Sequence, residues 1–193
     1  MKRFLAGLCL CALFMDVSAE QLPGDDTQAE IRDAKAAIKV LAGSLQTELK
    51  GAMQSGGPVA AIAVCNTQAM PITQQVSSDQ GMQLGRVSLK YRNPANAPNA
   101  WQRVVLEDFE QQKKVGKDVT TLTWSETVNV DGEREFRFMK AIPTGGVCLS
   151  CHGTMISPEV SQALAGVYPQ DRATGFNEGD IRGAFVVTRT LQN

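Results

Sequence analysis

The stretch Cys148-Leu149-Ser150-Cys151-His152 lies near the end of the chain and contains its single histidine. It has the C-x-x-C-H spacing by which a c-type haem is attached covalently. On the first turn of a helix, residues three positions apart share a face, so both thiols can reach the two vinyl groups of one porphyrin. His152 follows about 100° further round the helix, where its imidazole can ligate the iron. The sequence therefore predicts one haem c, bonded to Cys148 and Cys151, with His152 as the proximal iron ligand.

Three other uses of these residues stay open. In an exported chain the two cysteines can form a plain disulfide or a thioredoxin-like redox pair. A redox pair normally opens a helix early in a βαβ unit, whereas this motif follows predicted β-hairpins. A zinc site of Cys65, Cys148, Cys151 and His152 has the ligand count of Cys3His sites. Adjacent Cys151 and His152 lack the usual spacing of zinc ligands, however, so haem attachment is the favoured interpretation.

The first 19 residues have the pattern of a secretory signal peptide. A charged start and an apolar run over residues 4–15 precede the small residues Val17-Ser18-Ala19. We therefore expect a mature periplasmic protein made of a single domain over residues 20–193. No other stretch approaches the roughly 20 apolar residues that span a bilayer, so no integral membrane segment is expected in the mature chain. A net charge of −1 without a basic cluster gives no reason to expect nucleic acid as a partner.

The first third of the mature chain is predicted to be helical. From Asp26, apolar residues recur every three or four positions, until Gly56-Gly57-Pro58 ends the pattern. A second, shorter helix is expected over residues 59–69, with a break or kink at Pro71. Cys65 would therefore lie on a helix.

The rest of the chain is predicted to be mainly β. Residues 86–92 alternate polar and apolar side chains, as a half-buried strand does. Residues 122–130 and 135–142 form a predicted hairpin about Asp131-Gly132, and residues 181–191 form a final strand. A helix is expected from Trp101 to about Lys114, and a loop after the C-x-x-C-H motif. Four or so antiparallel strands with packed helices make an α+β domain.

The second axial position of the iron has few candidates. With one histidine, bis-histidine ligation within a monomer is excluded, and Met155 lies on the same side of the haem as His152. Cys65 is an attractive ligand, since thiolate is a strong donor to ferric iron and this cysteine has no evident disulfide partner. It can equally be a small buried hydrophobe on an apolar helix. The upstream candidates are Cys65, Met53, Met70, Met82, Met139 or an empty position.

Several segments together resemble the Tll-like family, whose members are single-haem c-type proteins with a PAS-like fold. These segments are residues 63–65, 84–94, 141–143, 148–153, 175–176 and 180–185, and they extend over most of the mature chain. The resemblance implies a PAS-like antiparallel sheet with a long N-terminal helix and flanking helices. It also implies that His152 and Cys65 are the two axial ligands.

Three basic residues are candidates to hold the haem propionates. Arg86, Lys90 and Arg92 share the polar face of the predicted strand, where they can form charge-assisted hydrogen bonds with carboxylates. The alternative is an ordinary solvated strand face, which is usually charged.

The site suggests function more than the fold does, since a PAS-like scaffold alone implies little. Thiolate ligation stabilises ferric iron and lowers its reduction potential. We therefore expect redox or diatomic-gas sensing, with NO or CO as the ligand. The chain contains no kinase, receiver or DNA-binding motif, so a redox or signalling protein partner would carry the output. The alternatives are a periplasmic electron-transfer cytochrome and a haem peroxidase-like enzyme, of which the enzyme is the less favoured.

Overall fold

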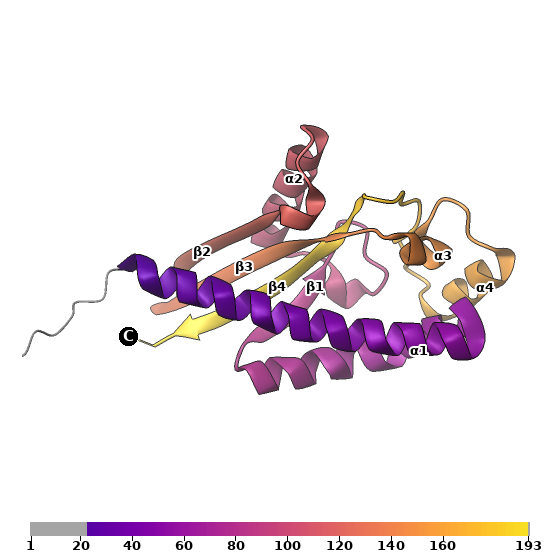
Figure 1. The fold of residues 1–193 in the computed structure, drawn as a ribbon, viewed down its shortest axis with the longest axis horizontal. Helices are drawn as coiled ribbons and strands as arrows, with labels where there is room; N and C mark the ends of the chain where they lie inside the picture. Colours follow the sequence, from indigo (N-terminus) through magenta and orange to yellow (C-terminus); the bar gives the residue numbers. More distant parts are fainter. Residues whose placement is uncertain (1–22, 193) are drawn as a thin grey trace, which may run out of the picture.

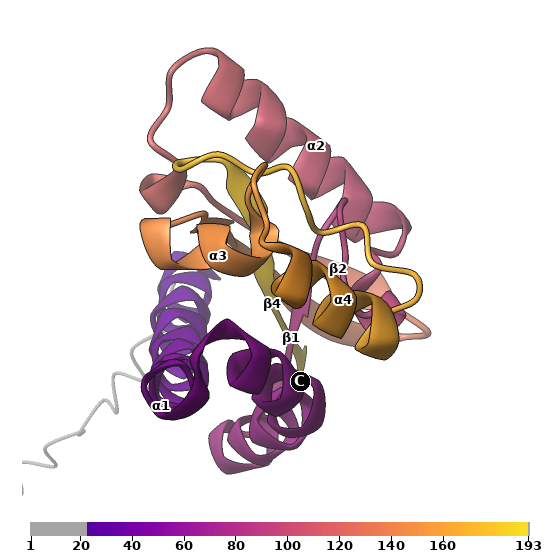
Figure 2. The ribbon, with the colours of Figure 1, turned by 90° about the vertical axis from the view of Figure 1, so that its right-hand side faces the viewer.

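A computed structural model describes residues 23–192, so the predicted signal peptide lies outside the described residues. Within them the chain forms a four-stranded antiparallel sheet in the order β1-β4-β3-β2, with helices on both faces (Figures 1 and 2). The strands are β1 (Gln83–Val87), β2 (Thr123–Val130), β3 (Glu133–Pro143) and β4 (Ile181–Leu191). The predicted α+β fold with a long N-terminal helix is confirmed.

The longest element, α1 (Pro23–Gln80), is bent into two arms at Gly56 and Gly57, which have non-helical backbone angles. Gly57 has φ 67°, a conformation that glycine adopts without strain. We call residues 23–55 the first arm and residues 58–80 the second arm. The second arm folds back beside the first (Figure 1). No helix within residues 23–192 is long and apolar enough to cross a bilayer.

The second arm is longer than the sequence predicts. It passes through Pro71 without a break and ends at Gln80, so the expected end near residue 69 is wrong. Thr73 and Val76, which follow the proline, are buried. The arm is also tied to the sheet, because the Leu84 N–H donates to Ser77 Oγ at 3.0 Å. Tertiary contacts thus offset the local cost of proline, about 3 kcal/mol in a helix interior.

Each sheet face packs against a different helix. On one face, Ala34, Ala37 and Ile38 of the first arm form a core with sheet residues that include Phe136 and Phe138. On the other, α2 (Ala100–Lys114) packs on sheet residues that include Met139 and Ala141; its core residues are Val105, Leu106 and Phe109. The period-two alternation along β3 therefore supplies both cores.

Two short helices follow β3, at the end of the molecule where α1 bends (Figure 1). They are α3 (Leu149–His152) and α4 (Pro158–Val167). The prediction of a loop over the α4 segment is wrong. Ser157 caps α4 by accepting from the Val160 N–H, and Val160 and Leu164 bury against Ile62 of α1. The Ser-Pro pair is a helix start signal, although the neighbouring glycines and prolines favour a loop. Three single turns of 3-10 helix complete the described elements: η1 (Pro94–Asn96), η2 (Val119–Thr121) and η3 (Gly146–Cys148).

The strand predicted over residues 86–92 is also corrected, because β1 ends at Val87. Ser88 leaves the sheet: its N–H donates to Asn96 O, and its hydroxyl donates to Arg182 O at 2.8 Å. Gly183 of β4 approaches Val87 so closely that a Cβ there would lie 2.3 Å from the Val87 carbonyl oxygen. Arg86 and Arg92 therefore do not share one strand face.

This close approach generates a stability prediction. Gly183→Ala forces backbone against backbone, which side-chain rotation cannot relieve, so we expect a loss of about 2 kcal/mol in the free energy of unfolding, measured by urea denaturation. Gly85→Ala on β1 is the matched control, since nothing lies within 4 Å of its Cβ position. It should be neutral or stabilising by up to about 1 kcal/mol. Equal unfolding free energies for the two variants would contradict the prediction.

Candidate functional site

The C-x-x-C-H motif forms a helical turn, in which η3 ends at Cys148 and α3 runs from Leu149 to His152. The turn stops at Gly153, whose N–H donates to Leu149 O at 2.9 Å. A Cβ at this glycine would lie 2.6 Å from the same oxygen, so no other residue fits without displacement. The Phe176 N–H donates to His152 O at 3.0 Å. The loop that contains Phe176 is thus hydrogen-bonded to the backbone of the motif.

The motif faces a hollow between both arms of α1, the ends of the sheet and α3. The hollow has two parts, with volumes of about 210 and 300 Å³. Cys65, Cys148 and His152 line both parts. Pockets of about 300–1,000 Å³ hold ligands of small-molecule size. Its apolar and aromatic wall residues include Leu49, Ile62, Tyr91, Ile142 and Tyr168. Apolar walls with converging sulfur and nitrogen atoms suit a flat, largely apolar cofactor.

Most of the predicted site residues converge on this hollow. Cys65, Cys148, Cys151, His152, Arg86 and Arg92 all line it. Lys90 does not; its ammonium donates to Thr174 O at 3.2 Å and lies 4.8 Å from the centre of the Phe176 ring.

The sulfur candidates for the second axial position are also separated. Met53 lines one part of the hollow and Met70 lines the other, whereas Cys65 lines both. Met82 and Met139 are buried in the two sheet cores.

His152 is held in the form that binds metals. Its Nδ1 lies 2.7 Å from Ala173 O, and because a carbonyl oxygen only accepts, Nδ1 must carry the proton. Nε2 is then the free acceptor. Burial, followed by the positive charges of Arg182 and Arg92, lowers the pKa of His152 to about 2, against the opposing effect of the Ala173 hydrogen bond. The imidazole is therefore neutral at ordinary pH, as metal ligation requires.

The three described cysteines are all free thiols. Cys65 is exposed yet lines the hollow, whose walls desolvate it enough to raise its pKa, while Arg86 and Arg92 act in the opposite direction. Burial also raises the pKa of Cys151. Among residues 23–192, no three His, Cys, Asp or Glu side chains are grouped to hold a metal ion, so the zinc alternative lacks its ligand set there.

Sequence reasoning missed Arg182, a third guanidinium in the wall of the hollow. Burial and the charges of Arg92 and Arg86 lower the pKa of Arg182 to about 10. Burial also lowers the pKa of Arg86, whose guanidinium makes no hydrogen bond or ion pair with any residue in 23–192. The signal in the sequence was an arginine between Ile181 and Gly183, directly before the apolar run of residues 184–187. A positively charged wall of this kind favours an anionic group.

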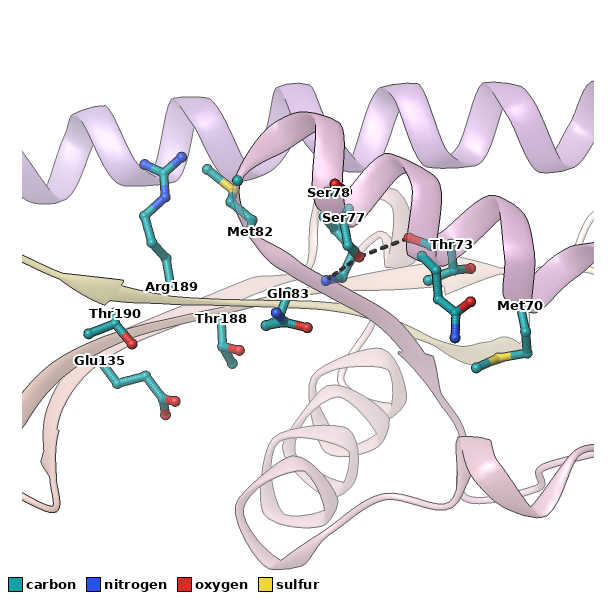
Figure 3. A pocket seen from close by; sticks show the side chains of 13 residues that line it. Met70, Thr73, Ser77, Ser78, Met82, Gln83, Glu135, Thr188, Arg189 and Thr190 are labelled. Atoms are coloured by element: carbon teal, nitrogen blue, oxygen red, sulfur yellow. Dashed lines mark hydrogen bonds between the residues drawn. The ribbon is translucent and has the colours of Figure 1, made fainter.

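A larger hollow of about 780 Å³ lies away from the motif, between the second arm and the sheet (Figure 3). Its labelled residues are mostly hydroxyl and amide side chains, such as Thr73, Gln83 and Thr188 (Figure 3). Its lining includes no cysteine, histidine or aromatic residue. The volume of a hollow alone therefore does not identify the one whose lining residues can bind a cofactor.

Comparison with known proteins identifies the family of this chain. The model of the Tll0287-like family matches residues 19–189. The chain belongs to the Tll0287-like family. Its fold is similar to that in the crystal structure of the cyanobacterial heme-protein Tll0287, with a TM-score of 0.57 and 24 % sequence identity over 90 % of this chain and 99 % of that one. Among curated proteins, none matches this sequence. The family resemblance drawn from the sequence segments is confirmed.

The contacts of Ser88 at the hollow of this family member can be tested by mutation. The buried hydroxyl accepts from Lys90 N and Arg182 Nη1 and lies within bonding distance of two carbonyl oxygens. Ser88→Ala should lower the unfolding free energy by about 1–3 kcal/mol, because buried polar groups lose their partner.

The matched control is Ser125→Ala on β2, whose half-buried hydroxyl bonds to no residue in 23–192. Its effect should stay within about 0.5 kcal/mol in the same chemical denaturation experiment. An equally small effect of Ser88→Ala would show that these hydrogen bonds contribute nothing to stability.

Proposed function

We propose that this chain is an exported mono-haem c-type protein that senses redox state or a diatomic gas. Cys148 and Cys151 would carry the thioether bonds, and His152 and Cys65 would be the axial ligands. One observation carries the proposal: all four residues, drawn from α1 and from the motif, line one hollow. The structural similarity to Tll0287, a heme-protein, supports it by analogy.

The charge of the hollow fits the cofactor. A haem has two propionate groups, and an apolar wall alone cannot hold carboxylates without a large desolvation cost. Arg86 is unpaired among the described residues, and Arg182 bonds only to Ser88 Oγ and Lys90 O, which are neutral. These two guanidiniums supply two positive charges beside the motif. We propose that they hold the propionates, since guanidinium binds carboxylate through strong charge-assisted hydrogen bonds.

The protein residues favour a particular iron chemistry. When bound, haem supplies an iron centre that accepts one electron and can bind a diatomic gas at an open position. His152 offers a neutral nitrogen held by the Ala173 carbonyl. Cys65 would bind as a thiolate, which would stabilise ferric iron and would be the weaker ligand after reduction. Release of Cys65 on reduction would open the position that NO or CO takes.

The predicted signal peptide supports the proposal that the protein works in the periplasm, where the signal would pass to another protein. Electron transfer is the second candidate function. His152 is held by the Ala173 carbonyl and by the perpendicular Phe176 ring, whose centroid lies 6.3 Å from that of the imidazole, and this favours fixed ligation through a redox cycle. The two functions differ in whether Cys65 stays bound in the ferrous state.

Covalent attachment is the first test. Wild-type protein made in a host that matures c-type cytochromes should retain its colour after acid-acetone extraction and show the mass of chain plus haem. Cys148→Ala combined with Cys151→Ala should lose this mass completely, because no thioether can form. Cys65→Ala is the control and should keep the covalent haem. Colour that is extracted from the wild type would refute the proposal.

The second axial ligand is tested by spectroscopy. Cys65→Ala should change the low-spin ferric optical and electron paramagnetic resonance spectra, whereas Met53→Leu, the matched change of another sulfur in the same wall, should leave them unaltered. An unchanged spectrum in Cys65→Ala would exclude Cys65 as the ligand.

Carbon monoxide and nitric oxide then separate the functions. Gas binding to the ferrous wild type, with loss of the cysteine ligand, supports sensing. Unchanged six-coordination in the ferrous state supports electron transfer, and peroxide turnover would support an enzyme instead.

A further inference from the structure

A buried ion pair contacts the backbone of the motif. Arg92 Nε donates to Asp171 Oδ2 at 2.9 Å, and the two side chains are only 11 % and 12 % exposed. Arg92 follows β1, and Asp171 lies in the loop after α4, so the pair joins distant parts of the chain. Removing two charges from water is costly, and a buried pair is retained most readily when further hydrogen bonds satisfy it. Its remaining contacts therefore indicate what it holds.

Those contacts converge on the backbone around His152. Arg92 Nη2 donates to Cys151 O at 2.6 Å and to Ala173 O at 3.3 Å. Asp171 Oδ1 accepts from the Ala173 N–H at 2.7 Å. Ala173 is thus held at both its N–H and its carbonyl by the ion pair. The same Ala173 carbonyl accepts the His152 Nδ1 proton at 2.7 Å.

We propose that Arg92 and Asp171 are positioning residues for His152, rather than Arg92 being a propionate ligand. The pair fixes the orientation of the imidazole and, through the shared Ala173 oxygen, its electron density. Hydrogen bonds to the outer nitrogen of a ligating histidine set ligand orientation and basicity in this way. The inference rests on the proposed ligation of iron by His152, and it deepens that proposal by naming what sets the ferric-to-ferrous balance.

Removal of Arg92 and removal of the Asp171 charge should shift the reduction potential of the haem in opposite directions. Arg92 competes with His152 for the lone pairs of the Ala173 oxygen, so its removal strengthens the His152 hydrogen bond and increases the electron density of the imidazole. Its removal also takes away a positive charge. Both effects stabilise ferric iron. Loss of the Asp171 charge leaves Arg92 uncompensated and stabilises ferrous iron.

The test is potentiometric titration of haem-loaded protein. At a fixed applied potential, Arg92→Leu should raise the ferric-to-ferrous ratio about tenfold, which equals a fall of about 59 mV for a one-electron couple. Asp171→Asn should shift the ratio in the opposite direction. Arg137→Leu is the matched control: it breaks ion pairs with Glu126 and Glu135, residues of β2 and β3 that do not line the hollow, and should leave the ratio unchanged.

Arg92→Lys separates geometry from charge. Lysine keeps the charge but lacks the planar fork that reaches Asp171 and two carbonyls together. We expect a fall in the potential smaller than that of Arg92→Leu, because only the hydrogen bond and not the charge is lost, together with a broadened or second low-spin signal in the electron paramagnetic resonance spectrum as the imidazole loses its single orientation. If Arg92→Leu fails to accumulate, Arg92→Lys and Asp171→Asn carry the test.

The outcomes distinguish the inference from the function on which it rests. Shifts of the same sign in Arg92→Leu and Asp171→Asn, or shifts no larger than that of Arg137→Leu, overturn the positioning role while leaving haem ligation intact. A single sharp wild-type signal in Arg92→Lys also overturns it. Wild-type protein without covalent haem, or without histidine ligation, refutes the proposed function before any variant is compared.

Discussion

The bend of α1 at Gly56 and Gly57 is the constraint on which the candidate site depends. A straight helix of this length would carry Cys65 far from the motif, at a rise of about 1.5 Å per residue. The positive φ of Gly57 returns the second arm beside the first. A Cβ on Gly56 would lie 2.8 Å from the Ala60 Cβ, so both glycines suit the bend. The two arms then become two walls of the hollow that the motif faces.

Electrostatics gives the hollow its chemical character. Three guanidiniums, those of Arg86, Arg92 and Arg182, line it, and Asp171 neutralises one of them. Buried charges are costly unless they are paired, so unpaired ones mark a place where an anionic group is expected. The larger hollow in Figure 3 lacks this feature, because its Arg189 pairs with Glu30 and Asp33. The unpaired positive charges in its wall, more than its volume, distinguish the candidate site from the larger hollow.

Local signals predicted much of the fold. The predicted turn at Asp131-Gly132 joins β2 to β3, with both residues at positive φ as a tight hairpin requires. The final strand, residues 181–191, coincides with β4. Where prediction failed, a distant contact outweighed the local pattern. Pro71 is tolerated because the arm that contains it packs on the sheet. The helix α4 forms because Leu164 packs against Ile62.

The sequence by itself determined the chemistry of the candidate site, because the spacing of the C-x-x-C-H motif is a covalent and local property of the chain. The lone histidine likewise limited which residues can be proposed as axial ligands before any fold was known. Only the tertiary structure decided which distant residues meet there. It brought Arg182 into the wall of the hollow, left Lys90 outside it, and joined Arg92 to Asp171 behind His152. These contacts form between segments far apart in the chain, where packing and charge rather than local periodicity select the partners.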